Sequence, residues 1–330
     1  MPISRSAHFF SDFAQSRTIA ILAGLTFALC NPWSANAELL AVSGGYDTNG
    51  NLLESFLYSV DESTGSANLV GSGTGVTHLS GLAIHPTTGV LYAIENVPTS
   101  GLGKLHTIDR ATGTASPIGN TNTLISDIGF HSNGTLYGWL EFGSSVAFTD
   151  DTDVLVTIDT ASAQIAFVGS HQVASNQTGL AFANDDTLYL KSGEVERGGK
   201  PQSEWIGSLR TLNPLDGSVE PTSASRLDTS PYSISTLTID DAGRGYTIVN
   251  YNEGSALESI NIETGEISHI GLITDANHLD ESGSPNPLNI RALVAVQAVP
   301  EPSSVLAIAI TSAAWIIFRR RKRLETTTAD

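Results

Sequence analysis

Short stretches in which apolar and polar residues alternate recur along the chain, and they predict β-hairpins. One phrase occurs five times, as FLYSVDESTGSANLVGS, KLHTIDRATGTASPIGN, VLVTIDTASAQIAFVGS, SLRTLNPLDGSVEPTSA and ALESINIETGEISHIGL. Each copy alternates on both sides of a turn such as Ala111-Thr112-Gly113 or Glu263-Thr264-Gly265. Alternation on either side of a turn-forming segment is typical of two antiparallel strands.

The spacing of this phrase predicts a propeller. The position just after the first strand of each copy is Asp61, Asp109, Asp159, Asn213 or Asn261, and these lie 48, 50, 54 and 48 residues apart. That period suits blades of four strands. A second phrase precedes the first and supplies two inner strands, as LSGLAIHPTTGVLYAI, SDIGFHSNGTLYGWL, TGLAFANDDTLYLKS and STLTIDDAGRGYTIV. The Asn, Asp and Gly between its halves are the residues that tight hairpin turns require.

The two ends of this region complement each other. The first unit begins at Leu39-Leu40-Ala41-Val42 and lacks an innermost strand, while a matching segment, Ile290 to Val296, stands at the other end. We therefore expect an all-β domain over residues 38–298, a five-bladed β-propeller that is closed by its C-terminal strand. An irregular ring of six or seven blades is the alternative.

The first 37 residues predict export. Arg5 and Arg17 precede the apolar run Ile19 to Cys30, and the small-residue pattern ending at Ala35 and Ala37 follows it. These are the parts of a signal peptide for the Sec machinery, with cleavage after Ala37. As a helix the run spans only about 18 Å, which is too short for a hydrocarbon core of about 30 Å. Because Cys30 is the only cysteine, the mature chain would form no disulfide.

The last part of the chain carries a second apolar run. Residues 305–318 predict a short transmembrane helix, and the basic cluster Arg319, Arg320, Arg321, Lys322 and Arg323 follows it. These cations resist translocation, so they and the tail 324–330 are expected to stay in the cytoplasm. Pro300, Glu301 and Pro302 stand just before the run. Together, residues 299–323 resemble the PEP-CTERM sorting signal.

That resemblance implies a location and partners. In the PEP-CTERM family the tail is read by an exosortase in the inner membrane, which cleaves near the motif, and the carriers occur in bacteria that make exopolysaccharide. The chain would be anchored transiently in the inner membrane, and after processing it would lie at the cell surface or outside the cell. Extracellular polysaccharide and other matrix proteins of a biofilm are the further partners implied. The extension Leu324 to Asp330 departs from the family pattern.

Charge and composition restrict the partners and cofactors. The chain has 34 Asp plus Glu against 16 Lys plus Arg, a formal net charge of −18 at pH 7, so no nucleic acid is expected. No cofactor is expected, and the histidines lack the spacing of a zinc site. Calcium is the cation considered, because oxygen ligands cluster in Asp150-Asp151-Thr152-Asp153 and in Asp47-Thr48-Asn49-Gly50-Asn51. Neither segment matches a complete calcium loop.

Innermost strands converge on the axis of a propeller, so aligned positions should meet there. One aligned set is polar: Ser80, Ser126, Thr178, Ser235 and Arg291. With Asp127, these are the candidate binding residues, which would ring one mouth of the channel. The alternative is that the hydroxyls only satisfy backbone groups at the strand ends.

Carboxylates near the axis are too few for a glycosidase, which needs two of them about 5 to 9 Å apart. Asp127 is the only one that precedes the turn on a predicted innermost strand, and Asp61, Asp109 and Asp159 repeat with the blades, which indicates a structural role. No catalytic residue is assigned. The sequence favours an exported, envelope-sorted protein of the exopolysaccharide or matrix with a non-catalytic propeller as binding platform. A secreted polysaccharide hydrolase or lyase acting at the channel is the alternative.

Overall fold

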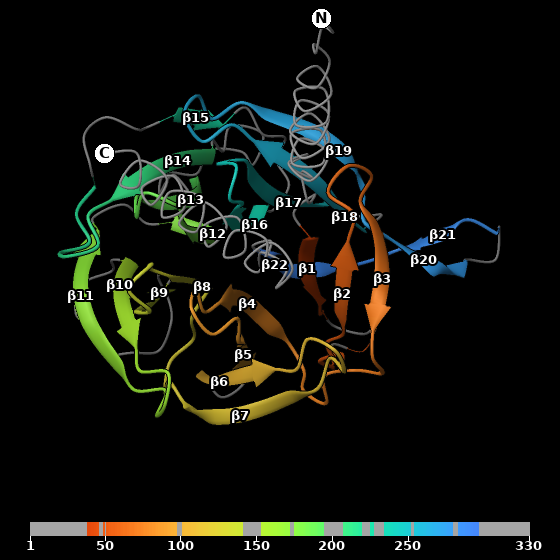
Figure 1. Ribbon diagram of the computed structural model, residues 1–330, viewed down its shortest axis with the longest axis horizontal. Coiled ribbons are helices and arrows are strands. Elements are labelled where there is room, and N and C mark those ends of the chain that lie inside the picture. The colour runs from red at the N-terminus through yellow and green to blue at the C-terminus, as the bar shows by residue number, and fades with distance from the viewer. Residues whose placement is uncertain are drawn as a thin grey trace, which may run out of the picture. The chain divides into compact units, whose positions relative to one another are not determined.

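Five small sheets stand in a ring and form a five-bladed β-propeller (Figure 1). The computed structural model describes residues 38–45, 49, 51–97, 101–140, 153–171, 175–194, 207–219, 225–227, 234–251, 254–279 and 283–296. The all-β class and the five blades predicted from the repeats are confirmed, and the alternative of six or seven blades is not. The predicted signal peptide, with Ala35 and Ala37, and the predicted sorting signal, from Pro300 to Arg321, lie outside the described residues.

Each blade contains four antiparallel strands, and in blades 2 to 5 these run in sequence from the axis outward. Blade 1 contains β22 (Ile290–Val296), β1 (Glu38–Ser43), β2 (Leu57–Val60) and β3 (Ser66–Val70). Blade 2 contains β4 (Leu79–Ile84), β5 (Leu91–Val97), β6 (Leu102–Ile108) and β7 (Ala115–Asn120). Blade 3 contains β8 (Asp127–Phe130), β9 (Leu136–Leu140), β10 (Asp153–Ile158) and β11 (Ile165–His171). Blade 4 contains β12 (Ser175–Phe182), β13 (Leu188–Glu194), β14 (Gly207–Leu212) and β15 (Ser225–Leu227). Blade 5 contains β16 (Ile234–Ile239), β17 (Gly245–Tyr251), β18 (Gly254–Ile260) and β19 (Ile267–Leu272).

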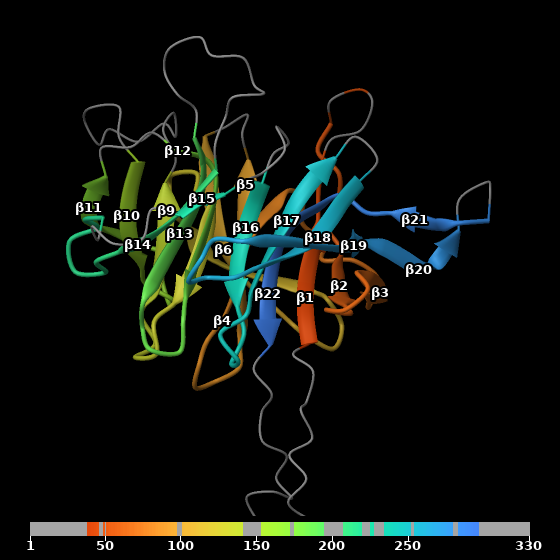
Figure 2. The ribbon, with the colours of Figure 1, turned by 90° about the horizontal axis from the view of Figure 1, so that it is seen from above.

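The ring is closed by β22, as predicted. This last strand pairs antiparallel with β1, from Glu38 opposite Val296 to Val42 opposite Ala292, and becomes the innermost strand of blade 1. Chain segments from the two ends of the domain are thereby joined by backbone hydrogen bonds, which replace a covalent closure. The start of β1 and the end of β22 lie at the same face of the ring, the lower one in Figure 2.

The repeated Asp or Asn of each phrase shapes the outer hairpin, the one between the third and fourth strands. In blade 2 the Asp109 carboxylate accepts hydrogen bonds from the amides of Ala111 and Thr112 at 2.8 and 2.9 Å. Gly113 then takes a positive φ of 73° and donates its amide to the Asp109 carbonyl. The other four blades repeat the turn around Asp61, Asp159, Asn213 and Asn261. Their structural role, inferred from repetition, agrees with this geometry.

Glycines on the outer strands bring neighbouring blades into backbone contact. A Cβ at Gly169 of β11 would overlap the carbonyl of Asp216, which lies in the outer turn of blade 4. A Cβ at Gly119 would meet the Ser162 carbonyl at 2.7 Å, and one at Gly271 would meet the Thr64 carbonyl at 2.8 Å. Each of these glycines receives the outer turn of the next blade, so the Gly near the end of the repeated phrase is a packing residue.

The hydrophobic core is divided into five wedges, one between each pair of blades. Between blades 2 and 3, for example, Ile94 and Leu105 pack against Ile128, Leu140 and Val156. Among the described residues, the wedge between blades 4 and 5 contains the fewest buried apolar side chains: Ala181, Leu209, Leu237 and Ile260. This wedge also contains a charged side chain, which is described below.

One hairpin was not predicted. The strands β20 (Thr274–Leu279) and β21 (Pro285–Pro287) extend the sheet of blade 1 outward, and β20 pairs parallel with β3 through Thr274 and Asp275. The hairpin projects from the ring at the right of Figure 1. Proline at both ends of β21 removes two amide donors from this edge, which limits pairing with another chain.

Candidate binding site in the axial channel

The free edges of the five innermost strands surround the axis, because each of these strands pairs with a second strand on one side only. Such an edge presents backbone N–H and C=O groups that the sheet leaves unpaired. The five strands β4, β8, β12, β16 and β22 contact one another in this order around the ring. The chemistry of the channel is therefore determined largely by what satisfies these backbone groups.

Asp127 satisfies several of them at once. Its carboxylate accepts the amide of Ile128 at 2.9 Å and, from the neighbouring strand β12, the amide of Leu180 at 3.0 Å. It also accepts the amide of Leu237 and the hydroxyl of Thr236, the latter at 3.3 Å. Donors from β8, β12 and the β16 strand thus meet on one side chain that is only 1% exposed. Asp127 ties blades 3, 4 and 5 together at the axis.

Two threonines continue this capping toward blade 1. The Leu293 amide donates to the Thr236 hydroxyl at 3.3 Å, and the Ala295 amide donates to the Thr238 hydroxyl at 2.8 Å. Thr236 lies at a β-bulge with a φ of 68°, a conformation that is costly for a β-branched residue. Its hydroxyl bonds to both Asp127 and β22, so this backbone conformation places a side chain that links blade 5 to the closing strand.

Burial raises the pKa of Asp127 to about 8, although the four donors act in the opposite direction. The pKa of Asp in an unfolded chain is about 4. Between these two pH values the folded chain binds a proton that the unfolded chain has released, so this group's contribution to the free energy of unfolding falls as the pH rises from about 4 to about 8.

This pH dependence is expected to disappear when Asp127 is replaced by asparagine. The difference in free energy of unfolding between the chain that keeps Asp127 and the Asp127→Asn chain should fall across that pH range, by at most about 1.4 kcal/mol per pH unit. Urea unfolding at a series of pH values measures it. The lowered pKa of Lys191 makes stability rise with pH, and Asp127 itself acts on that pKa. Both chains in this comparison therefore also carry Lys191→Met, so that the difference isolates Asp127. A difference that does not change with pH would contradict the assignment.

Lys191 is the charged side chain in the wedge between blades 4 and 5. It lies opposite Gly179 of β12 and opposite Leu209 of β14, and a Cβ at Gly179 would overlap the backbone of Thr236 and Leu237. The side chain is 0% exposed, and its amine has no hydrogen-bond partner among the described residues. Burial lowers the pKa of Lys191 well below its usual value, while the nearby Asp127 opposes this shift.

We expect Lys191→Met to raise the free energy of unfolding by about 1–3 kcal/mol at pH 6, where Asp127 retains its proton. Methionine keeps the length of the side chain and removes the cost of burying an amine without a partner. Urea denaturation measures the change. The matched control is Lys104→Met, which removes a half-exposed amine 3.3 Å from Glu95 and should change stability by less than about 1 kcal/mol. If the Lys191→Met chain is less stable than the wild type, the amine stabilises the folded chain, which would contradict this account.

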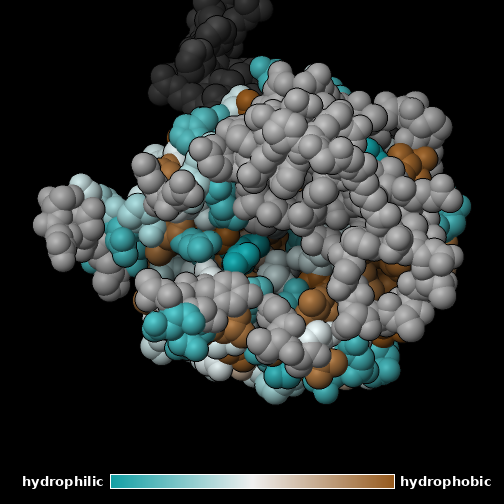
Figure 3. All heavy atoms as spheres, turned by 180° about the vertical axis from the view of Figure 1, so that it is seen from behind, coloured by the Kyte–Doolittle hydropathy of each residue, from teal (hydrophilic) through white to brown (hydrophobic). Residues whose placement is uncertain are grey.

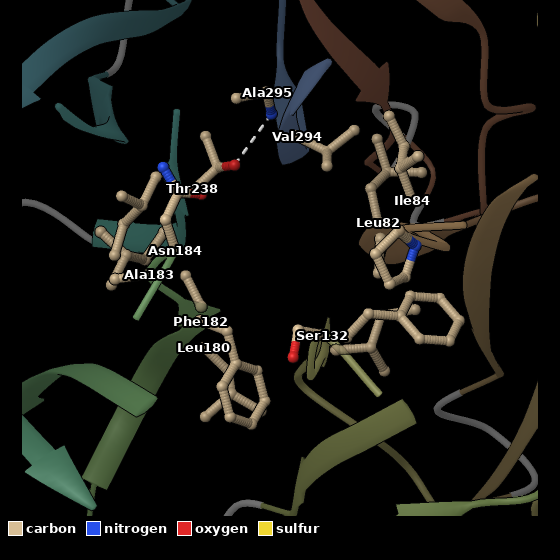
Figure 4. Close-up of a pocket in the computed structure, with 18 of the residues that line it drawn as sticks. Leu82, Ile84, Ser132, Leu180, Phe182, Ala183, Asn184, Thr238, Val294 and Ala295 are labelled. Carbon is tan, nitrogen blue, oxygen red and sulfur yellow. Dashed lines mark hydrogen bonds between the residues drawn. The ribbon is translucent and has the colours of Figure 1, made fainter. Parts of the chain in front are cut away.

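A cavity of about 290 Å³ lies on the axis beyond this polar layer (Figure 4). It is lined by the last residues of the innermost strands, among them Ile84, Phe130, Phe182, Ile239 and Ala295. Val294 and Ala295 belong to the end of β22, so the cavity lies at the face from which the two ends of the domain leave the ring.

The rim of the cavity is made of hydrogen-bonded turns from neighbouring blades. Ser132 donates its hydroxyl to Asp186 at 2.7 Å, and Asn184 donates its amide to the carbonyl of Asp241 at 2.7 Å. The ring of His131 lies 3.5 Å from Asp186. Although Ser, His and Asp meet here, the Ser132 hydroxyl donates to the carboxylate and, among the described residues, not to the histidine, so these side chains lack the Ser–His hydrogen bond of a catalytic triad.

The candidate binding residues from the sequence lie toward the other end of the innermost strands, and none of them lines the cavity. Ser80 accepts from Asn96 and donates to the Ile125 carbonyl, and Thr178 is buried. Arg291 is half-buried, Ser126 donates its amide to the Trp139 carbonyl, and the side chain of Ser235 lies outside the described residues. Figure 3 shows this opposite face, where hydrophilic and hydrophobic residues lie side by side near the axis.

A buried acid and histidine lie behind this opposite mouth. The Nε2 atom of His106 is 3.0 Å from the Glu95 carboxylate, and Lys104 reaches the same oxygen at 3.3 Å. Burial lowers the pKa of His106, and the contact with Glu95 opposes that shift. Within the described ranges, His, Cys, Asp and Glu form no cluster of three that could hold a metal ion. Of the calcium candidates, Asp150, Asp151 and Asp47 lie outside those ranges.

Within the part of the chain that the structure describes, no helix is long and apolar enough to cross a membrane. The predicted transmembrane segment 305–318 lies outside that part.

The alignment of the innermost strands places small residues in one column at the axis, and all five of them line the cavity: Ala83, Gly129, Ala181, Thr238 and Val294. The rim of the cavity and its larger apolar residues were not predicted. Pro86, Ser132 and Asn184 lie in the turns between the two inner strands of their blades, and their position around one mouth follows only when the five blades are placed side by side. The signal that could have found them is the alignment of the second phrase, whose apolar ends Ile84, Phe130, Phe182 and Ile239 occupy one column.

Comparison with known proteins gives neighbours in fold only. No known protein family matches the sequence, and no curated protein matches it. One similar structure is an exo-β-1,3-galactanase from Clostridium thermocellum, with 12% identity, a TM-score of 0.44 and coverage of 70% of this chain and 52% of that one. The chain thus spans about half the length of the galactanase.

Two other solved structures are similar to a comparable degree. A protein of unknown function from Bacteroides caccae has 8% identity and a TM-score of 0.42 over 79% of this chain and 99% of that one. The PQQ-bound aldose sugar dehydrogenase from Streptomyces coelicolor has 18% identity and a TM-score of 0.39 over 67% of this chain and 69% of that one. At such identities and scores the neighbours carry no argument about what this chain binds or catalyses.

Proposed function

We propose that this chain is an exported, envelope-sorted protein of the exopolysaccharide or extracellular matrix, and that its propeller binds without catalysing a reaction. One observation carries the second half of this proposal. Asp127 is the only carboxylate on the described innermost strands, and backbone amides and a hydroxyl from three strands occupy its oxygens. Because this side chain is 1% exposed and its oxygens are turned to those donors, it does not present a carboxyl group to a substrate in the channel.

Support for the first half comes from the sequence. The signal peptide pattern, the Pro300-Glu301-Pro302 tripeptide and the basic end agree with export through the inner membrane and with processing by an exosortase. The acidic composition agrees with a partner that is neutral or cationic. Neutral extracellular polysaccharide meets these conditions, and nucleic acid does not.

Incubating the purified chain with polysaccharide extracted from the producing cells tests the proposal. We expect the protein to be retained by the polysaccharide in co-sedimentation, while the number of reducing ends and of unsaturated sugar ends stays constant over time. New reducing ends would support the hydrolase alternative, and new unsaturated ends would support the lyase. Absence of retention would overturn the binding function. A chain unfolded in urea before mixing is the control for trapping within the polymer.

A further inference from the structure

The cavity contains backbone groups that the fold leaves unused. His131, Ala183 and Asp240 donate their amides to the carbonyls of Thr135, Thr187 and Arg244, the residues just before the second strand of blades 3, 4 and 5. Along a strand the direction of the N–H and C=O groups alternates. The residue before each of these three therefore turns both its amide and its carbonyl toward the axis.

These inward residues are Phe130, Phe182 and Ile239, and the same pattern assigns Ile84, because His85 donates its amide to Val90. The two-residue alternation is also seen in the polar layer. Two positions before Phe130, Phe182 and Ile239 stand Ile128, Leu180 and Leu237, and the amides of these three residues donate to Asp127. All four inward residues line the cavity.

The polar layer around Asp127 and the cavity differ in which groups bond to the inward backbone amides. At the polar layer, Asp127 and Thr236 cap the inward amides. At the cavity, Thr238 caps the amide of Ala295, and within the described residues no side chain bonds to the amides of Ile84, Phe130, Phe182 or Ile239. The cavity is thus surrounded by alternating donors and acceptors that are available to a ligand.

This arrangement selects one ligand chemistry. An anion would meet the inward carbonyls as well as the amides, in a chain whose net charge is already −18. A purely apolar ligand would cover polar backbone groups without bonding to them, which costs free energy. A hydroxyl both donates and accepts, so a ligand rich in hydroxyls matches an edge that offers both groups.

Size and rigidity fit the same class. The cavity volume of about 290 Å³ is that of roughly ten water molecules, which accommodates one sugar ring. Its aromatic walls are held from behind, because the Phe130 ring packs 5.0 Å from His85 and the Phe182 ring 5.2 Å from His131. A cavity with fixed walls loses little conformational entropy when a ligand binds.

We propose that this cavity binds one ring of a neutral sugar chain through the inward amides and carbonyls of Ile84, Phe130, Phe182 and Ile239. The inference rests on the proposed polysaccharide-binding function and assigns it to one place, the face of the ring from which the two ends of the domain leave. The six residues suggested by the sequence would then contribute to the architecture of the channel.

Two variants that block the cavity from different blades test the proposal. Ser132→Trp and Asn184→Trp each place a bulky ring on the exposed rim, and Ser116→Trp places the same ring on the exposed outer strand of blade 2 as a matched control. Isothermal titration with D-glucose, D-galactose and D-mannose measures binding, with sodium sulfate and 1-hexanol as the anionic and apolar probes. Thermal unfolding of each variant shows whether it is folded.

We expect at least one sugar to bind the wild type and the Ser116→Trp chain. For both blocking variants, the dissociation constant of that sugar should rise by about tenfold or more. Binding of sulfate alone, of hexanol alone or of no probe would overturn the sugar assignment, as would unchanged sugar binding by the blocking variants. Co-sedimentation separates the two proposals. If both folded blocking variants still bind the native polysaccharide as the wild type does, the cavity assignment fails and the proposed function stands. If sugars bind but the polysaccharide is not retained, the proposed function fails and the cavity assignment stands.

Discussion

Replacing Asp127 by alanine is expected to lower the free energy of unfolding by about 3–5 kcal/mol, because several buried donors would lose their acceptor together. The amides of Ile128, Leu180 and Leu237 would face an apolar void, and each uncompensated donor costs about 1–3 kcal/mol. Urea unfolding followed by tryptophan fluorescence measures the loss, and Trp139, which is fully buried in blade 3, is a suitable reporter.

Asp127→Asn is the matched comparison for this change. Its side-chain carbonyl keeps one acceptor at the centre of the channel, so it should lose less than half of what the alanine variant loses. If Asp127→Ala unfolds within about 1 kcal/mol of the wild type, the carboxylate does not hold the three blades together. That result would also remove the reason for excluding Asp127 from catalysis.

A second large effect is expected at the outer rim of the ring. Gly169→Ala should lower the free energy of unfolding by about 3 kcal/mol, because the added Cβ would overlap the Asp216 carbonyl and push the outer turn of blade 4 away from blade 3. Thermal unfolding and the urea midpoint measure the change.

Gly129→Ala is the control for the effect of replacing a glycine in a strand. There the added Cβ would have the Leu180 carbonyl oxygen as its nearest neighbour, at 3.3 Å, and a shift of a few tenths of an ångström accommodates it. We expect a change of less than about 1 kcal/mol at this position. Equal losses in the two variants would mean that contact between the blades is not what requires glycine at position 169.

The fold could be predicted from the sequence because the same local interactions occur in every blade. The turn after Asp109 recurs after Asp61, Asp159, Asn213 and Asn261, and each copy fixes one hairpin by hydrogen bonds within a few residues. The closing strand could be predicted because blade 1 lacks an inner strand and Ile290 to Val296 matches it. Both inferences use information that is local in the chain or repeated along it.

The channel could be predicted only in part. Asp127 was found because it is unusual on an innermost strand, but its four donors come from residues up to 110 positions away, and alignment does not reveal them. Lys191 gave no signal, since an isolated lysine in a strand is usually exposed. The hairpin β20–β21 was missed because it belongs to one blade and breaks the repeat.

Closure by β22 has a consequence for export. The strand ends at Val296, and the Pro300-Glu301-Pro302 tripeptide begins four residues later. A cut near the tripeptide would therefore leave every blade intact. The predicted sorting tail would then be separable from the propeller without loss of stability. Because the cavity opens at the face of the chain ends, release would also separate it from the membrane to which the tail is expected to be tethered.

Mass spectrometry of the protein recovered from the cell-surface and extracellular fractions of producing cells tests most directly whether a complete, exported propeller is the functional form. We predict a chain that begins at Glu38 and ends near Pro300 to Pro302, with all of β22 retained. A chain in these fractions that keeps its basic end through Arg323, or one that still begins at Met1, would contradict the proposed export and processing.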